Sequence, residues 1–70
     1  MRIELWDTFN NCRISCHNNI INAVMAQRKH SVAVVKANGI NSYLTYAFLY
    51  PNGNSVDDEL ITEIKLKLDN

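Results

Sequence analysis

Acidic residues are absent from the long middle part of this chain. No Asp or Glu occurs between Asp7 and Asp57. The cations of the same stretch are Arg13, Arg28, Lys29 and Lys36. Residues 57–70 then carry five acids and two lysines, so a formal net charge of zero conceals a basic middle segment and an acidic tail. Because buried elements exclude charge of either sign, a stretch with so few charges must be built mainly from a buried helix face and buried strands.

The chain has 70 residues, which is enough for one domain spanning positions 1–70. A domain of this size buries only about 60% of its unfolded surface, so its stability is marginal. Disulfides, a metal or a partner chain are the usual remedies. A hydrophobic content of 47% argues against disorder. We therefore expect one small folded domain, with a homodimer as one possible assembly.

The first half of the chain predicts a strand followed by a helix. Residues 2–6 alternate, which places Ile3 and Leu5 on one face of a strand. Residues 7–14 predict either a loop or a strand that bends back. Ser15 is a suitable cap for a helix over residues 16–29. The apolar stripe of that helix would be Cys16, Ile20, Ile21, Val24 and Met25.

The second half predicts a hairpin and a final helix. Residues 31–37 are rich in Val and favour a strand, Asn38-Gly39 is a strong hairpin signal, and residues 43–50 favour the return strand. Ser55 and Asp58 approximate a capping box for a helix that runs towards the C-terminus. Its apolar face would be Val56, Leu60, Ile61, Ile64 and Leu68. Alternation over residues 64–68 leaves a strand as the rival interpretation.

These elements predict an α+β fold: a two-layer sandwich of a small antiparallel sheet with two helices on one face. The expected order is β-α-β-β-α, or β-α-β-β-α-β if the chain ends in a strand. The second order would be a small ferredoxin-like fold.

Four side chains resemble metal ligands or a catalytic pair: Cys12, Cys16, His17 and His30. Zinc requires four convergent N or S donors, and the usual CxxC spacing is missing. Neighbouring helix positions point about 100° apart, so Cys16 and His17 would not face each other as nucleophile and base. The sequence carries no phosphate-binding loop and no nucleophile elbow. We therefore expect no metal, no cofactor and no enzymatic activity.

The basic residues predict a candidate patch for nucleic acid. Arg28, Lys29 and Lys36 could neutralise phosphates, and exposed aromatic side chains stack on bases. The aromatic candidates are Tyr43, Tyr46 and Tyr50. Four cations are few, however, and tyrosines also pack sheets. Nucleic-acid binding through this patch is therefore the alternative function.

The acidic tail predicts a second surface. Asp57, Asp58, Glu59 and Glu63 begin the last predicted helix, where acids also stabilise the helix dipole. Carboxylates along one exposed face resemble a row of phosphates, and a protein that bears them can occupy a basic groove. These four residues are the candidate partner-binding site.

The predicted β-α-β-β-α order, the acidic last helix and the opening Met1-Arg2-Ile3-Glu4 together resemble the DinI-like DNA-damage regulators. The short single-domain format is also similar to that of anti-CRISPR proteins carried by phages. Both resemblances imply a protein that acts by binding, and the first implies a DNA-handling target. The expected function is therefore a protein-binding inhibitor or regulator of a larger complex, encoded by a phage or mobile element.

The start of the chain lacks the apolar core of a signal peptide, and no stretch is long enough to cross a membrane. We therefore expect a cytoplasmic protein with no membrane partner, in which Cys12 and Cys16 are reduced thiols.

Overall fold

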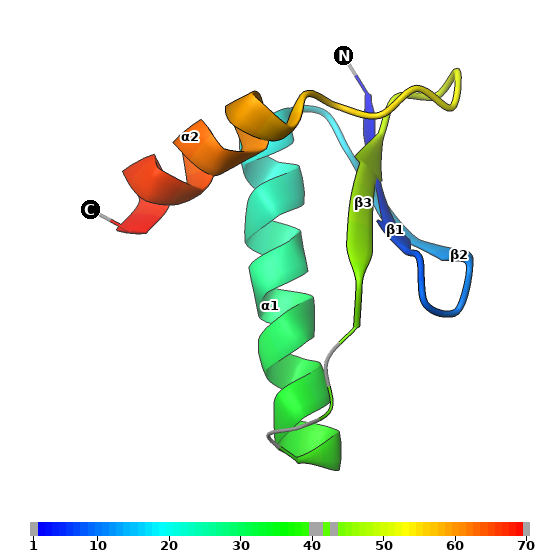
Figure 1. Cartoon of the computed structure of the whole chain (residues 1–70), viewed down its shortest axis with the longest axis vertical. Helices are drawn as coiled ribbons and strands as arrows, with labels where there is room; N and C mark the ends of the chain where they lie inside the picture. Colours follow the sequence, from blue (N-terminus) through cyan, green and yellow to red (C-terminus); the bar gives the residue numbers. More distant parts are fainter. Residues whose placement is uncertain (1, 40–41, 43, 70) are drawn as a thin grey trace.

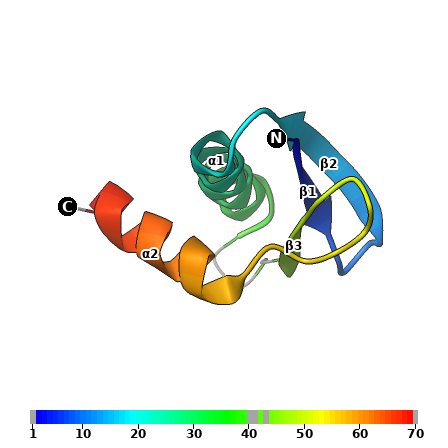
Figure 2. The same ribbon diagram turned by 90° about the horizontal axis from the view of Figure 1, so that it is seen from above.

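The fold has two layers, a three-stranded sheet and a pair of helices. The computed structural model describes residues 2–39, 42 and 44–69. The elements found there are β1 (Ile3–Asp7), β2 (Cys12–His17), α1 (Ile20–Asn38), β3 (Tyr46–Leu49) and α2 (Asp58–Asp69). All strand pairs are antiparallel, with β1 in the centre of the order β2-β1-β3. Both helices lie on the same side of the sheet (Figures 1 and 2), which confirms the predicted fold class.

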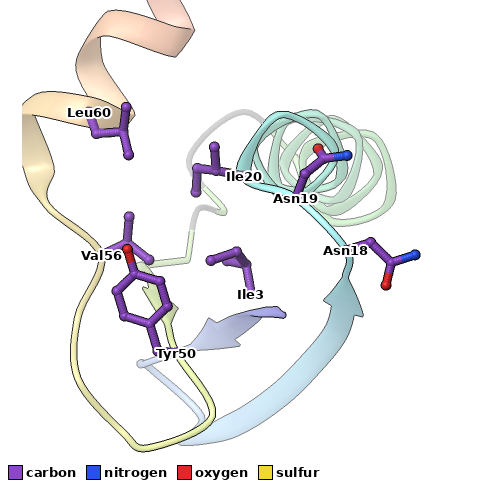
Figure 3. A pocket seen from close by; sticks show the side chains of 7 residues that line it. All are labelled: Ile3, Asn18, Asn19, Ile20, Tyr50, Val56 and Leu60. Carbon is purple, nitrogen blue, oxygen red and sulfur yellow. The ribbon is translucent and has the colours of Figure 1, made fainter. Parts of the chain in front are cut away.

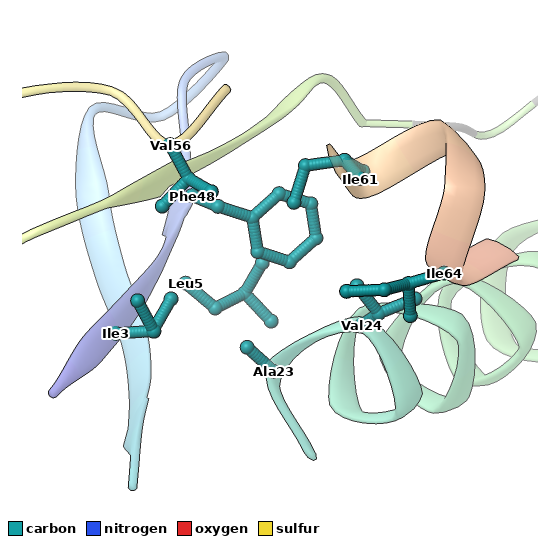
Figure 4. Packing of buried hydrophobic residues seen from close by; sticks show 8 residues of the cluster. All are labelled: Ile3, Leu5, Ala23, Val24, Phe48, Val56, Ile61 and Ile64. Atoms are coloured by element: carbon teal, nitrogen blue, oxygen red, sulfur yellow. The ribbon is translucent and has the colours of Figure 1, made fainter. Parts of the chain in front are cut away.

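The core lies between the sheet and the helices. Ile3 and Leu5 of β1 face it together with Phe48 of β3, because successive side chains of a strand point to opposite faces. Both helices and the segment before α2 complete the cluster (Figure 4). Their contributions are Ala23, Val24, Val56, Ile61 and Ile64. Each element thus has one side in a single small core.

The hairpin lies before α1, not after it. Residues 12–17 form β2, so the interpretation in which the chain bends back after β1 is the right one of the two for that segment. The pairing shifts between Leu5–Ser15 and Trp6–Arg13, which leaves Ile14 as a bulged residue. Ile14 packs against the core. The element order of the described residues is therefore β-β-α-β-α, which has the predicted number of strands and helices in a different order.

The predicted first helix began too early. Ser15 and Cys16 lie in β2, and the true cap is Asn19, whose Oδ1 accepts the N–H of Asn22 at 2.9 Å. Asn19 also places its carbonyl oxygen 3.3 Å from the backbone nitrogen of Ala23, which starts the helical hydrogen-bond ladder.

The strand predicted over residues 31–37 is wrong, because α1 continues to Asn38. The inner side of α1, which includes the buried Ala23, continues at helical spacing through the half-buried Ser31, Val34 and Val35. Packing along this side outweighs the low helix propensity of Val, which costs a fraction of a kcal/mol per residue relative to Ala. The predicted Asn38-Gly39 hairpin is a helix end: the N–H of Gly39, at a φ of 103°, donates to the Val35 carbonyl oxygen at 2.8 Å.

The strand predicted over residues 43–50 is shorter in the structure, where β3 spans Tyr46–Leu49. Residue 43 lies outside the described residues.

Helix α2 confirms the helical interpretation of the chain's end, and the rival strand over residues 64–68 is wrong. Ile61 and Ile64 are buried on its inner side. The cap is Asp57 and not Ser55, because the Asp57 Oδ1 accepts the N–H of Glu59 at 3.0 Å and its carbonyl accepts that of Ile61 at 3.2 Å. Ser55 instead forms a bridge with Leu49.

A carboxylate holds the turn between β1 and β2. Asp7 is 4% exposed, and its Oδ1 accepts the N–H groups of Phe9 and Asn10 at 2.9 and 3.0 Å. The Asn10 amide nitrogen donates to Oδ2 at 2.7 Å. The hydrogen bonds from Asn10, backbone first and side chain second, lower the pKa of Asp7 despite its burial. Asn11 closes the turn at a φ of 55°, a conformation that Asn tolerates.

The two helices are joined by Arg28. Its Nη2 lies 2.8 Å from the Asp69 carboxylate and 3.1 Å from the Lys65 carbonyl oxygen, both in the last turns of α2. A cation in this place also suits the negative end of the α2 dipole. Arg28 thus secures the part of α2 that lies beyond the buried Ile64. Neither helix in the described part of the chain is both long and apolar enough to traverse a bilayer.

Replacing Asp7 tests the turn. Asp7→Ala removes the acceptor for two backbone N–H groups, so we expect its midpoint of urea unfolding to fall clearly below that of the wild type. Asp7→Asn retains one amide oxygen as acceptor and should lie between the two. Equal midpoints for Asp7→Ala and the wild type would show that the turn forms without the carboxylate.

Asp7 should also make stability depend on acid. Because its pKa is lowered in the folded chain, the carboxylate stabilises fully above the unfolded pKa of about 4. This stabilisation is lost as the pH falls through the lower, folded pKa. The free energy of unfolding, measured in urea from pH 6 to pH 2, should therefore fall more steeply below pH 4 for the wild type than for Asp7→Asn. Parallel curves would contradict the assignment.

Replacing Arg28 tests the contact between the helices. Arg28→Ala should destabilise the chain by about 1 kcal/mol, because one partly exposed ion pair and one charged hydrogen bond are lost. Hydrogen exchange should accelerate mostly in residues 65–69. Lys29→Ala is the matched control, since Lys29 is the next residue and is exposed. An equal effect of both variants would mean that the contacts of Arg28 with α2 do not contribute to stability.

Candidate functional site

The acidic residues gather along the outer side of α2. Asp58, Glu59, Thr62, Glu63 and Leu66 line a shallow open groove, which we call the acidic face. Successive positions in this set are one or three residues apart, so they share one side of the helix. That side is opposite to Ile61 and Ile64, which the core buries. The amphipathic pattern of α2 therefore presents carboxylates to solvent as a consequence of core packing.

The acids predicted as a contact site are not equivalent. Asp57 caps α2 through its side chain and stands outside the groove. Glu63 lies 3.3 Å from Lys67, four residues on, and both side chains are mostly exposed. Asp58 and Glu59 occupy the first turn, where the helix dipole stabilises negative charge. The structure thus brings Asp58, Glu59 and Glu63 together and assigns Asp57 to the cap.

Leu66 belongs to the acidic face and was missed as a site residue. Its side chain is 61% exposed, at the C-terminal end of the groove. The signal was present in the sequence, because Leu66 does not fit the apolar stripe of the last helix. A large apolar side chain beside carboxylates is the combination that binding surfaces use, since burial supplies affinity and charge supplies orientation.

The predicted basic patch is reduced to two lysines. Arg28 is engaged with α2, whereas Lys29 and Lys36 are exposed on α1. Seven residues separate these lysines, which places them about 20° apart around the helix. Tyr46 packs against the core and hydrogen-bonds to His30, with Oη 2.8 Å from Nδ1, so it is not presented beside the lysines for base stacking.

The candidate metal ligands do not converge. Cys12 and Cys16 pair with Asp7 and Glu4, which alternate across β1, so the two thiols lie on opposite faces of the sheet. His17 contacts Ser15, with Nε2 2.7 Å from Oγ, and His30 contacts Tyr46. Within residues 2–39, 42 and 44–69, no three Cys, His, Asp or Glu side chains are grouped as metal ligands would be.

A polar cluster joins the far end of β1 to α1. Asp7 is paired with Tyr46 across the sheet, and the Tyr46 ring stands edge-on to His30 at 5.7 Å between centroids. Burial and the nearby Asp7 charge raise the pKa of Tyr46. The cluster satisfies polar groups at the edge of the core, and the sequence did not reveal it because its members come from three separate elements.

A pocket that the sequence did not predict lies at the start of α1 (Figure 3). It has a volume of about 290 Å³. Ile3, Ile20, Val56 and Leu60 supply apolar walls, and the other lining residues are Asn18, Asn19 and Tyr50. Its size is at the lower limit of small-molecule sites. The described lining residues include no carboxylate, imidazole or thiol, so the pocket suits an apolar group and not acid–base chemistry.

Comparison with known proteins adds no assignment to this geometry. No protein-family model, no curated protein and no solved structure matches the chain.

Proposed function

We propose that this chain is a non-enzymatic protein-binding module that inhibits or regulates a larger complex, and that the acidic face of α2 is its contact surface. The partner would present a basic groove of the kind that handles nucleic acid. In this proposal the chain is one of the small regulators that phages and mobile elements encode. The observation that carries it is the acidic face itself, where Asp58, Glu59 and Glu63 accompany an exposed Leu66.

The dimensions of the acidic face support a groove-binding role. Asp58 and Leu66 are eight residues apart, which is about 12 Å along the helix axis. Carboxylates spread over this distance attract a basic surface from afar, and Leu66 adds apolar area that a partner can bury. Only part of the resemblance to DinI-like regulators supports this function. The acidic last helix is present, but the hairpin precedes α1 instead of following it.

Binding explains the acidic face better than catalysis does. General acid–base catalysis depends on carboxyl groups with perturbed pKa values in sites that exclude water. Asp58, Glu59 and Glu63 are exposed on an open helix surface. The contact between Ser15 and His17 joins neighbouring positions of one strand, and a hydrolytic site also requires an orienting group and oxyanion donors.

Nucleic-acid binding through α1 is the second candidate. It is favoured by the sequence of α1, which carries no acid over Ile20–Asn38. It is weakened by the engagement of Arg28, which leaves Lys29 and Lys36 as the exposed cations of this helix. Titration with generic single- and double-stranded oligonucleotides at rising salt tests it, because phosphate contacts give a steep loss of affinity with salt.

Crosslinking followed by kinetics tests the proposed function. A photoreactive residue at Leu66 should capture a protein from an extract of the native host, and the same residue at the exposed Phe9, in the turn between β1 and β2, is the control. With the captured partner purified, Glu59→Lys/Glu63→Lys should lower the association rate by about tenfold or more at low salt. The difference should shrink at high salt.

A matched variant separates charge from shape. Glu59→Gln/Glu63→Gln preserves side-chain size, and its association rate should lie between those of the wild type and the reversed variant. Circular dichroism of both variants controls for folding. If the reversed variant folds and associates at the wild-type rate, the acidic face is not the contact surface.

A further inference from the structure

Helix α1 carries an exposed surface that the described elements do not cover. Met25, Lys29, Val32 and Lys36 lie within about 60° of one another around the helix, and we call this set the α1 outer face. Met25 is 53% exposed and Val32 is 55% exposed. Met25 and Lys36 are eleven residues apart, which is about 16 Å along the helix axis. It therefore combines large apolar side chains with two cations.

The α1 outer face points away from the sheet. The opposite side of the helix holds Ala23 and Val24 in the core, and α2 packs near Val24 and Arg28 (Figures 1 and 4). Towards its C-terminus α1 extends past the beginning of β3, and α2 does not cover that part (Figure 1). Exposed apolar side chains beside cations are thus presented on a rigid helix, where a partner can dock without reshaping the chain.

The acidic face of α2 has the complementary chemistry. It presents carboxylates around an exposed Leu66 over about 12 Å, where the α1 outer face presents lysines around Met25 and Val32. Within one molecule the two cannot meet, because α2 directs Ile61 and Ile64 towards the core and the acidic face away from it. A second molecule supplies what each face lacks.

We propose that copies of this chain associate head to tail, with the acidic face of one copy docked on the α1 outer face of the next. Because two different surfaces meet, the contact is heterologous and leaves one free face at each end. The carboxylates Glu59 and Glu63 oppose Lys29 and Lys36, and Leu66 packs against Met25 and Val32. The contact uses the acidic face assigned above to the protein partner, so self-association and partner binding compete.

The pattern of α1 favours a second copy over nucleic acid. A phosphate backbone would contact the lysines and leave Met25 and Val32 exposed to water. The acidic face of a second copy also brings Leu66, which can pack against both of these apolar side chains. The formal net charge of the chain is zero, so long-range electrostatic repulsion between copies is weak and does not oppose their association.

Charge reversal and its rescue test the proposal. In sedimentation velocity at low salt, the average mass of the wild type should rise with protein concentration and return towards the monomer in high salt. Lys29→Glu/Lys36→Glu and Glu59→Lys/Glu63→Lys should each lower the apparent association constant by about tenfold or more. The variant with all four substitutions has the charges exchanged between the faces, and it should associate again.

The rescue distinguishes a lost contact from a lost fold, since a misfolded double variant would not recover when two more residues are changed. A wild type that stays monomeric at every concentration would overturn the proposal. A quadruple variant that folds but does not associate would also overturn it. The same holds if Lys29→Glu/Lys36→Glu abolishes oligonucleotide binding and has the same mass distribution as the wild type.

The same variants separate this proposal from the proposed function. Lys29→Glu/Lys36→Glu leaves the acidic face intact, so it should bind the captured partner at least as fast as the wild type while failing to self-associate. A monomeric wild type that still binds its partner through the acidic face would refute self-association alone.

Discussion

The structure depends on the burial of the inner face of β1. This strand is the centre of the sheet, so both other strands hydrogen-bond to it, and its inward side chains belong to the same core cluster as residues of both helices. Leu5 is fully buried in the middle of this contact, as is Val24 of α1. Full burial of one such side chain stabilises by roughly 1.5–3 kcal/mol, which is a large share of what a domain of this size can have. Without β1, neither β2 nor β3 would have a strand partner in the described sheet.

A core of this size leaves much of the helix surface uncovered. Helix α1 has 19 residues and β3 has four, so the sheet cannot cover the whole helix. Polar contacts take over where the apolar core ends: Asp7 and Tyr46 lie at one edge of the α1–sheet contact, and Arg28 secures the far half of α2. The exposed sides of α1 and α2 follow from this geometry. Both proposals concern those sides, because large apolar side chains remain exposed there beside charges of one sign.

The candidate site was partly predictable. Asp58, Glu59 and Glu63 were identified from the charge pattern, and helical spacing alone places them on one side of α2. The sequence did not distinguish the role of Asp57 from theirs. A capping residue and an acid in the first helical turn are neighbours in sequence, and it is their backbone geometry that differs. Arg28 was grouped with Lys29 and Lys36, yet its partner Asp69 is 41 residues away, and no local pattern encodes that contact. The pocket at the start of α1 likewise gathers residues from both ends of the chain.

The sequence by itself determined β1 and the α+β class and favoured α2 over a final strand, because alternation of period two and helical spacing are written in consecutive residues. Tertiary structure decided the rest. Residues 12–17 became a strand because β1 offers its edge, and Cys16, which fits an apolar helix stripe, pairs with Glu4 instead. Residues 31–37 became helix because Ser31, Val34 and Val35 extend the inner side of α1, and packing along that side exceeds the cost of the low helix propensity of Val. In both segments the local preference is small, and contacts with distant residues supply the larger free energy.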